Sequence, residues 1–309
     1  MGYAHLFLRV IDLRTLERKK AFWGFIFTLP AIIFFAMFSF YPMANAFWTS
    51  FFKKELLSLK APKFVGLNNY LYLLRSEAFW NSIKATAIFA FGTFVPMVLF
   101  SLSFAALILT RKRFQKFLQM AYYSPAVLSS VVAAAIWLLI FDPRGLSNQF
   151  LNFLFNTKGI DYRWLSRENM LRLATIIVYF WKYVGYFTII FVAGMASIPR
   201  SIHEAATIDG ANRWQDFWHI TLPLIRPTTL LVSVMSMIQC LRTFSTQYLF
   251  VQGGAPIKPI DVITLSIYNT AIRDRQIGRA SAMSVILFLI IMSFSYLQIR
   301  VSKTENITY

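Results

Sequence analysis

Two positively charged side chains, Lys182 and Arg242, stand inside long apolar stretches of this 309-residue sequence and are its first candidates for chemistry. If each stretch is a membrane-spanning helix, Lys182 lies about 11 residues from the outer end of its helix, a depth of about 16 Å at 1.5 Å per residue. Arg242 lies about eight residues from the outer end of its own helix, a depth of about 12 Å. An ionisable side chain at membrane depth is costly, so it marks a functional site by default.

Polar and aromatic side chains accompany both cations at helical spacing. Residues at i, i+3, i+4 and i+7 share one helix face, and two such faces occur: Tyr179, Lys182, Tyr183 and Tyr186 in one stretch, and Ser236, Gln239, Thr243 and Gln247, beside Arg242, in another. Aromatic rings stack on sugar rings, while hydroxyl and amide groups exchange hydrogen bonds with sugar hydroxyls. The two faces therefore predict a path for a hydroxylated substrate.

The role of the cations has two interpretations. Each can extend its charge to the membrane surface or pair with an acid on a partner subunit, as we expect for Lys84 near the end of its stretch. Alternatively, Lys182 and Arg242 face a central cavity. The apolar stretches contain no acidic residue, so an anionic substrate is then favoured, such as an oligosaccharide of uronate units of the alginate or pectin type.

A third candidate is the polar segment 198–227, "IPRSIHEAATIDGANRWQDFWHITLPLIRP". Its pattern predicts two short helices separated at Gly210. Ser201, with Glu204 three residues later, predicts an N-cap with a capping box. Taken by itself, such a segment reads as an amphipathic linker that lies on lipid headgroups.

The elements that must position these residues follow from composition. The chain is 57% hydrophobic and only 14% charged, whereas a soluble domain is about a quarter charged. A spanning helix needs about 20 mainly apolar residues. Six stretches are long enough: 22–48, 80–109, 120–141, 171–194, 228–250 and 281–299. We predict an all-α polytopic membrane protein with six transmembrane helices and both ends on the same side.

Basic residues indicate which side that is. The chain holds 31 Lys and Arg against 13 Asp and Glu, a net charge of +18. With the N-terminus inside, 14 Lys and Arg fall in cytoplasmic segments and 13 in outer ones, so the totals do not decide. The compact run "TRKRFQK" at 110–116 favours the N-terminus in the cytoplasm.

Segment 204–223, "EAATIDGANRWQDFWHITLP", resembles the signature loop of permease subunits of binding-protein-dependent ABC importers. "FVGLNNY" at 64–70 and "FVQGGAP" at 250–256 resemble the carbohydrate branch of that family, the maltose and glycerol-phosphate (type I) permeases. Two positions depart from the pattern: Ala255 interrupts the usual Gly-Gly-Pro, and Ser245 replaces a common acid. The signature residues are Glu204, Ala205, Ala206, Asp209, Gly210, Ala211, Ile220, Leu222 and Pro223.

The resemblance implies a single permease domain at 22–300 in a bacterial inner membrane, with cytoplasmic ends 1–21 and 301–309. Loop 195–227, between spans four and five, is then a coupling helix that seats in an ATPase subunit, and those two spans line the sugar pocket. The implied partners are two ATP-binding cassette ATPase subunits, a second permease of different sequence, an external solute-binding protein, membrane lipid and an oligosaccharide.

Other classes fit the sequence less well. It has no G-x-x-x-x-G-K-[ST] phosphate loop, so we expect no enzyme activity and no cofactor of its own, with ATP and Mg²⁺ bound by the partner ATPase. One Cys and no ligand spacing argue against a metal site. An ion-coupled secondary transporter needs intramembrane carboxylates, and a nucleic-acid binder does not need apolar stretches. A neutral oligosaccharide or a sugar phosphate remains an alternative substrate.

Overall fold

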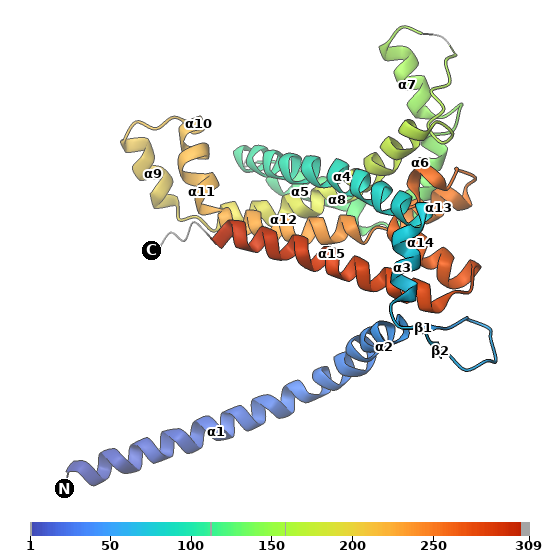
Figure 1. Cartoon of the computed structure of the whole chain (residues 1–309). Coiled ribbons are helices and arrows are strands. Elements are labelled where there is room, and N and C mark those ends of the chain that lie inside the picture. The colour runs from blue at the N-terminus through green and yellow to red at the C-terminus, as the bar shows by residue number, and fades with distance from the viewer. Residues whose placement is uncertain (1, 112, 158, 304–309) are drawn as a thin grey trace.

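The computed structural model describes residues 2–111, 113–157 and 159–303, with side chains for 19–111, 113–157 and 159–302. Helices dominate, which confirms the predicted all-α membrane fold (Figure 1). Helix α1 (Gly2–Phe35) runs through the predicted N-terminal segment 1–21 into the first span, and the division between the two stays a prediction. Residues 304–309 of the predicted tail lie outside the described residues.

The six predicted spans appear as four continuous helical stretches and two bent pairs. The continuous ones are Lys19–Thr49, Glu77–Thr110, Glu168–Ala196 and Ile277–Ser302. The third predicted span is α5 (Gln115–Val127) followed by α6 (Ser130–Ile140), which meet at 96°. The fifth, Arg226–Gln252, meets the preceding segment Arg213–Leu224 at 68°. Counting each bent pair as one span gives six.

The π-helix η1 (Ala36–Phe40) and α2 (Tyr41–Thr49) complete span one, and α13 (Ser245–Gln252) completes span five. Short elements connect the spans: the antiparallel strands β1 (Phe52–Lys53) and β2 (Lys63–Phe64), α3 (Asn68–Arg75), α7 (Leu146–Leu154), η3 (Lys258–Ile260), α14 (Ile263–Tyr268) and η4 (Asn269–Arg273). Figure 1 places the strands, α3 and α7 at the end opposite to the 195–227 loop. The start of α1 and the end of α15 (Ile277–Lys303) lie at the loop's end, as an even number of spans requires.

The core forms where α4 (Glu77–Thr110) and α8 (Glu168–Ala196) pack along each other, with α5 and α12 (Arg226–Leu241) against them. Its largest fully buried side chains include Phe187, Phe191 and Met97. Backbones also come very close at one point, because a Cβ on Gly185 of α8 would lie 1.8 Å from the carbonyl oxygen of Tyr122 in α5. Only glycine permits that approach of α5 to α8.

Span one stands apart from this core. In its most apolar window no side chain is buried within the chain, and Figure 1 shows α1 extending away from the other helices. Contact with the rest of the described chain runs through α2, which packs on α15 and β1.

Replacing Gly185 with Ala should disrupt the packing of α5 against α8. The added methyl group meets backbone that cannot move aside, so we expect the free energy of unfolding to fall by about 3 kcal/mol, the upper range for overpacking. The measurement is the thermal midpoint of the purified complex in detergent. Gly24→Ala is the control, since nothing lies within 4 Å of a Cβ there; equal midpoints for the two variants would contradict the close approach.

Asp261, which follows η3 in the segment between spans five and six, should make stability depend on pH. Its Oδ1 is buried with no hydrogen-bond partner among the described residues, and burial raises the pKa of its carboxyl from 3.8 to about 6. The folded state therefore holds this proton more tightly than the unfolded chain, and the stabilisation, full below about pH 4, is lost as the pH rises through 6.

Asp261→Asn should accordingly raise the thermal midpoint at pH 7.5, by the equivalent of about 1–3 kcal/mol, and leave it unchanged at pH 4. The exposed Asp274→Asn serves as the matched control and should change neither. A loss of stability in Asp261→Asn at pH 7.5 would show that the charged carboxylate is needed.

Candidate functional site

The 195–227 loop folds as four short helical elements: α9 (Arg200–Ile208), α10 (Arg213–Asp216), the π-helix η2 (Phe217–Thr221) and α11 (Leu222–Leu224). The two predicted short helices are thus confirmed as α9 and α10. The predicted N-cap at Ser201 is wrong, because α9 begins at Arg200, directly after Pro199. Ser201 is already inside the first helical turn, where its hydroxyl is no longer placed to cap.

The turn after α9 explains part of the signature. Gly210 has φ +85°, a left-handed conformation that glycine adopts without steric cost. The N–H of Gly210 donates to the carbonyl of Thr207 at 3.1 Å, and the N–H of Ala211 donates to that of Ala206 at 2.9 Å. These two bonds define a Schellman motif, so Gly210 ends α9 sharply and Ala211 folds back onto Ala206.

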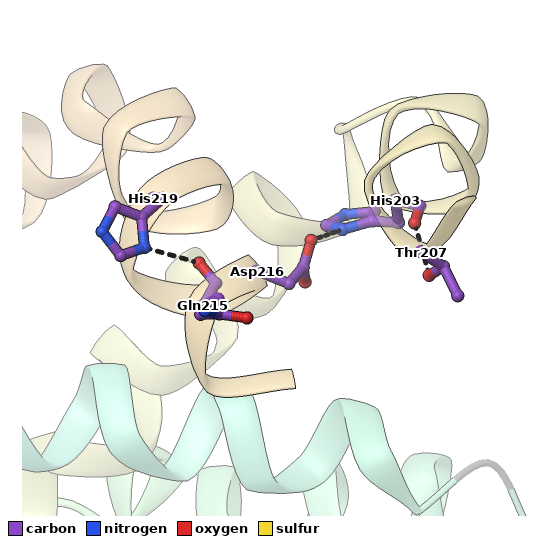
Figure 2. A network of polar contacts seen from close by, with 5 residues as sticks. All are labelled: His203, Thr207, Gln215, Asp216 and His219. Atoms are coloured by element: carbon purple, nitrogen blue, oxygen red, sulfur yellow. Dashed lines mark hydrogen bonds and ion pairs between the residues drawn. The ribbon is translucent and has the colours of Figure 1, made fainter. Parts of the chain in front are cut away.

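The next helix begins at once, with its own cap. The Asn212 side chain accepts from the N–H groups of Trp214 and Gln215 at 3.0 and 2.9 Å, while the Gln215 amide oxygen accepts from the Asn212 N–H at 2.9 Å. This is a capping box, although not the one predicted. A side-chain contact then joins the two helices: Nδ1 of His203 lies 2.8 Å from Oδ1 of Asp216 (Figure 2).

The signature residues divide by exposure. Glu204, Ala205, Asp209 and Gly210 are exposed, Ala206 is buried, and Ala211, Ile220, Leu222 and Pro223 are half-buried. Glu204 pairs at 3.0 Å with Arg200 of the same helix, but both side chains are mostly exposed, and such pairs contribute little to stability. The exposed carboxylates of Glu204 and Asp209 are therefore accessible to another protein.

Span five is interrupted close to Arg242. Helix α12 ends at Leu241 and α13 begins at Ser245. Two carbonyl groups at the interruption accept hydrogen bonds from side chains instead of from the helix backbone. The Tyr179 hydroxyl donates to the Gln239 carbonyl at 3.0 Å, and the Thr264 hydroxyl donates to the Thr243 carbonyl. Tyr179, predicted to face substrate, thus supports the break in this conformation.

Lys182 lies against the bend in the other interrupted span. Its side chain is buried, and Nζ donates to Oγ of Ser130, the first residue of α6, at 2.8 Å. The ammonium also lies 5.1 Å from the ring centroid of Tyr183, a cation–π distance. Sequence reasoning missed Ser130, although a Ser-Ser pair shortly after Pro125 in an apolar stretch signals a break.

Arg242 is exposed. Within the part of the chain that the structure describes, no hydrogen bond, ion pair or ring contact holds its guanidinium group. It lies at the carboxyl end of α12, where the helix dipole favours a cation. Arg242 is therefore positioned by its helix, and its charge is available to a ligand or a partner.

The remaining predicted pathway residues lie near Lys182 or on span five. The rings of Tyr183 and Tyr179 are tilted by 48° with their centroids 4.6 Å apart. Tyr186 is half-buried, and its ring centroid lies 6.5 Å from that of Tyr123. Gln239 is half-buried, and the buried Ser236 hydroxyl donates to its own helix, at the Ser233 carbonyl.

Thr243 and Gln247 are both buried at the break. The Thr243 hydroxyl donates to the Gln247 Oε1 at 3.0 Å. The Gln247 Nε2 is buried, and no group among the described residues accepts a hydrogen bond from it. It is therefore an unpaired donor at the break.

Known proteins resemble the chain along nearly its whole length. A family model described as "Binding-protein-dependent transport system inner membrane component" matches residues 97–304. A probable starch degradation products transport system permease protein of Thermoanaerobacterium thermosulfurigenes is 31% identical over 94% of this chain and 97% of its own length. An sn-glycerol-3-phosphate transport system permease protein of Agrobacterium fabrum is 31% identical over 89% of this chain and 93% of its own length.

A solved structure shares the fold. It belongs to a bacterial ABC transporter involved in the import of the acidic polysaccharide alginate, with a TM-score of 0.78 and 24% identity over 96% of this chain and 99% of that one. The architecture of the spans and the 195–227 loop is thus one that a known importer also uses.

Removing the Tyr179 hydroxyl should destabilise the break in span five. Tyr179→Phe leaves the Gln239 carbonyl without its donor, and an unsatisfied buried acceptor costs about 1–3 kcal/mol, which we expect as a lower thermal midpoint. Tyr186→Phe is the control, since no hydrogen bond of its hydroxyl is found within the described residues. Equal midpoints for the two variants would show that the Tyr179 bond does not support the break.

Proposed function

Because the chain belongs to the family of binding-protein-dependent transport system inner membrane components, we propose that it is the permease subunit of an ABC transporter that imports oligosaccharides, with acidic, uronate-containing ones preferred. It works with two ATPase subunits that bind ATP and Mg²⁺, a second permease of different sequence, and an external solute-binding protein. The N-terminus lies in the cytoplasm, and this chain hydrolyses no ATP itself.

Arg242 is the observation that carries the preference for acidic substrates. Its guanidinium group is exposed at the interruption of span five, and the six apolar stretches of the sequence contain no carboxylate that could neutralise it. An arginine presents a fixed, planar set of donors that matches a carboxylate in two parallel hydrogen bonds. A uronate unit passing this point would supply that carboxylate.

The names of the relatives are consistent with either a neutral or an anionic substrate. The Thermoanaerobacterium relative is named for starch degradation products, which are neutral, and the Agrobacterium relative for sn-glycerol-3-phosphate, which is an anion. A neutral oligosaccharide or a sugar phosphate is therefore the alternative within the same class of importer.

The geometry also suggests how ATP hydrolysis reaches the substrate. The exposed residues of α9 would contact the ATPase, while α10, η2 and α11 lead directly into α12. Helix α12 is 16 residues long, about 24 Å at 1.5 Å per residue, and Arg242 lies at its far end. Movement of the loop would displace α12 as a rigid body and shift Arg242, opening the pathway alternately to the two sides.

The experiment is ATPase stimulation in the reconstituted complex. The binding protein is loaded in turn with neutral and uronate oligosaccharides of equal length, and we expect stronger stimulation and uptake with the uronate set. Stimulation by the neutral set alone would reject the acidic substrate and keep the importer. No stimulation by any loaded binding protein would reject the importer.

Arg242→Gln should reduce uptake of uronate oligosaccharides at least about tenfold, since losing a charged hydrogen-bonded partner costs about 1.5–3 kcal/mol. Uptake of any neutral substrate should be unaffected. Lys84→Gln is the matched control, because Lys84 is also an exposed cation of a span, but on α4 rather than on span five. Equal loss of uptake in the two variants, or with both substrate sets, would contradict the assigned role of Arg242.

A further inference from the structure

We propose that the contact between His203 and Asp216 is the strut that makes α9 and α10 move as one unit, so that ATPase movement reaches span five. The inference rests on the proposed function, but it concerns a pair of residues outside the family signature. Both are positioning residues, since neither lies in the substrate pathway.

The strut is a specific polar contact between two helices. His203 comes from the first half of α9 and Asp216 is the last residue of α10, and their side chains meet at 2.8 Å. Figure 2 shows the two side chains pointing toward each other across the space between the helices. Their side chains are 34% and 27% exposed, respectively, so the contact is partly shielded from water and stronger than an open surface pair.

No other side-chain hydrogen bond or ion pair joins α9 to α10 within the described residues. The Schellman bonds after α9 stay within α9 and its turn, and the capping box stays within α10. Both motifs fix where the helices end and begin, but neither fixes the angle between them. The Schellman bonds end at Ala211 and the capping box begins at Asn212, so neither motif spans the link between them, and the side-chain contact is what holds that angle.

The angle matters because the two helices meet different partners. The exposed signature residues Glu204, Ala205 and Asp209 belong to α9 and its turn, whereas α10 continues into α12 through η2 and α11. If the angle changes when the ATPase closes, the chain bends at the link between Ala211 and Asn212, and α12 stays in place. ATP is then hydrolysed without movement of substrate.

A second histidine in the same loop provides an internal control. His219 Nδ1 lies 3.1 Å from the Gln215 carbonyl, four residues earlier in the same helical run, and its side chain is exposed (Figure 2). It bridges no two helices. Replacing it removes a histidine of the loop and leaves the strut intact.

The test compares His203→Ala, Asp216→Ala, the double variant and His219→Ala in the reconstituted complex with its binding protein. The readout is substrate transported per ATP hydrolysed, together with the amount of ATPase that copurifies. For either strut variant we expect this ratio to fall about fivefold or more, the scale of a typical coupling free energy. ATP hydrolysis and copurified ATPase should stay unchanged, the double variant should be no worse than either single one, and His219→Ala should match the native protein.

Two results would overturn the proposal. One is a native ratio in His203→Ala, or a ratio no lower than that of His219→Ala. The other is a fall in copurified ATPase that accounts for the lost transport, because the pair would then serve assembly. Failure of the importer itself is recognised separately, since the native complex would then show no transport for any loaded binding protein.

Discussion

Water is excluded from the interior of a bilayer, so every backbone N–H and C=O group at that depth needs a partner inside the protein. Continuous helices meet this requirement automatically, but the third and fifth spans are interrupted. The chain compensates with side chains: Ser129 accepts from the N–H of Val132 at the start of α6, and Tyr179 and Thr264 donate to carbonyls around the end of α12. Much of the polar character of these spans is committed to keeping the breaks stable.

The same requirement separates two cations that look equivalent in the sequence. Lys182 is a compact charge that reaches Ser130 at one break, and it is buried there. Arg242 ends a helix at the other break, and its long side chain remains exposed. Each break thus carries one positive charge, but only the one at Arg242 is accessible in this conformation.

Patterns of apolar residues and the spacing of the loop signature were sufficient to predict the number of spans, the two loop helices and the turn at Gly210. These features depend on local sequence, which is why they could be read directly. The partners of Lys182 and Tyr179 come from residues 52 and 60 positions away, and no local pattern encodes such pairings. The error at Ser201 has a local cause. Pro199 occupies the N-cap position of α9, so Ser201 is already in the helix, and the capping box of the loop is formed by Asn212 at the start of α10.

The isolation of span one has a consequence for biosynthesis. A helix whose apolar window buries no side chain against its own chain derives its stability from lipid or from a neighbouring subunit rather than from the fold that follows. It precedes the other described spans in the chain, so it leaves the ribosome before them and can enter the bilayer while they are still being made. The packed part of the molecule begins with α2 (Tyr41–Thr49), which contacts α15, so the part of span one before Tyr41 can enter the bilayer before its neighbours in the fold exist.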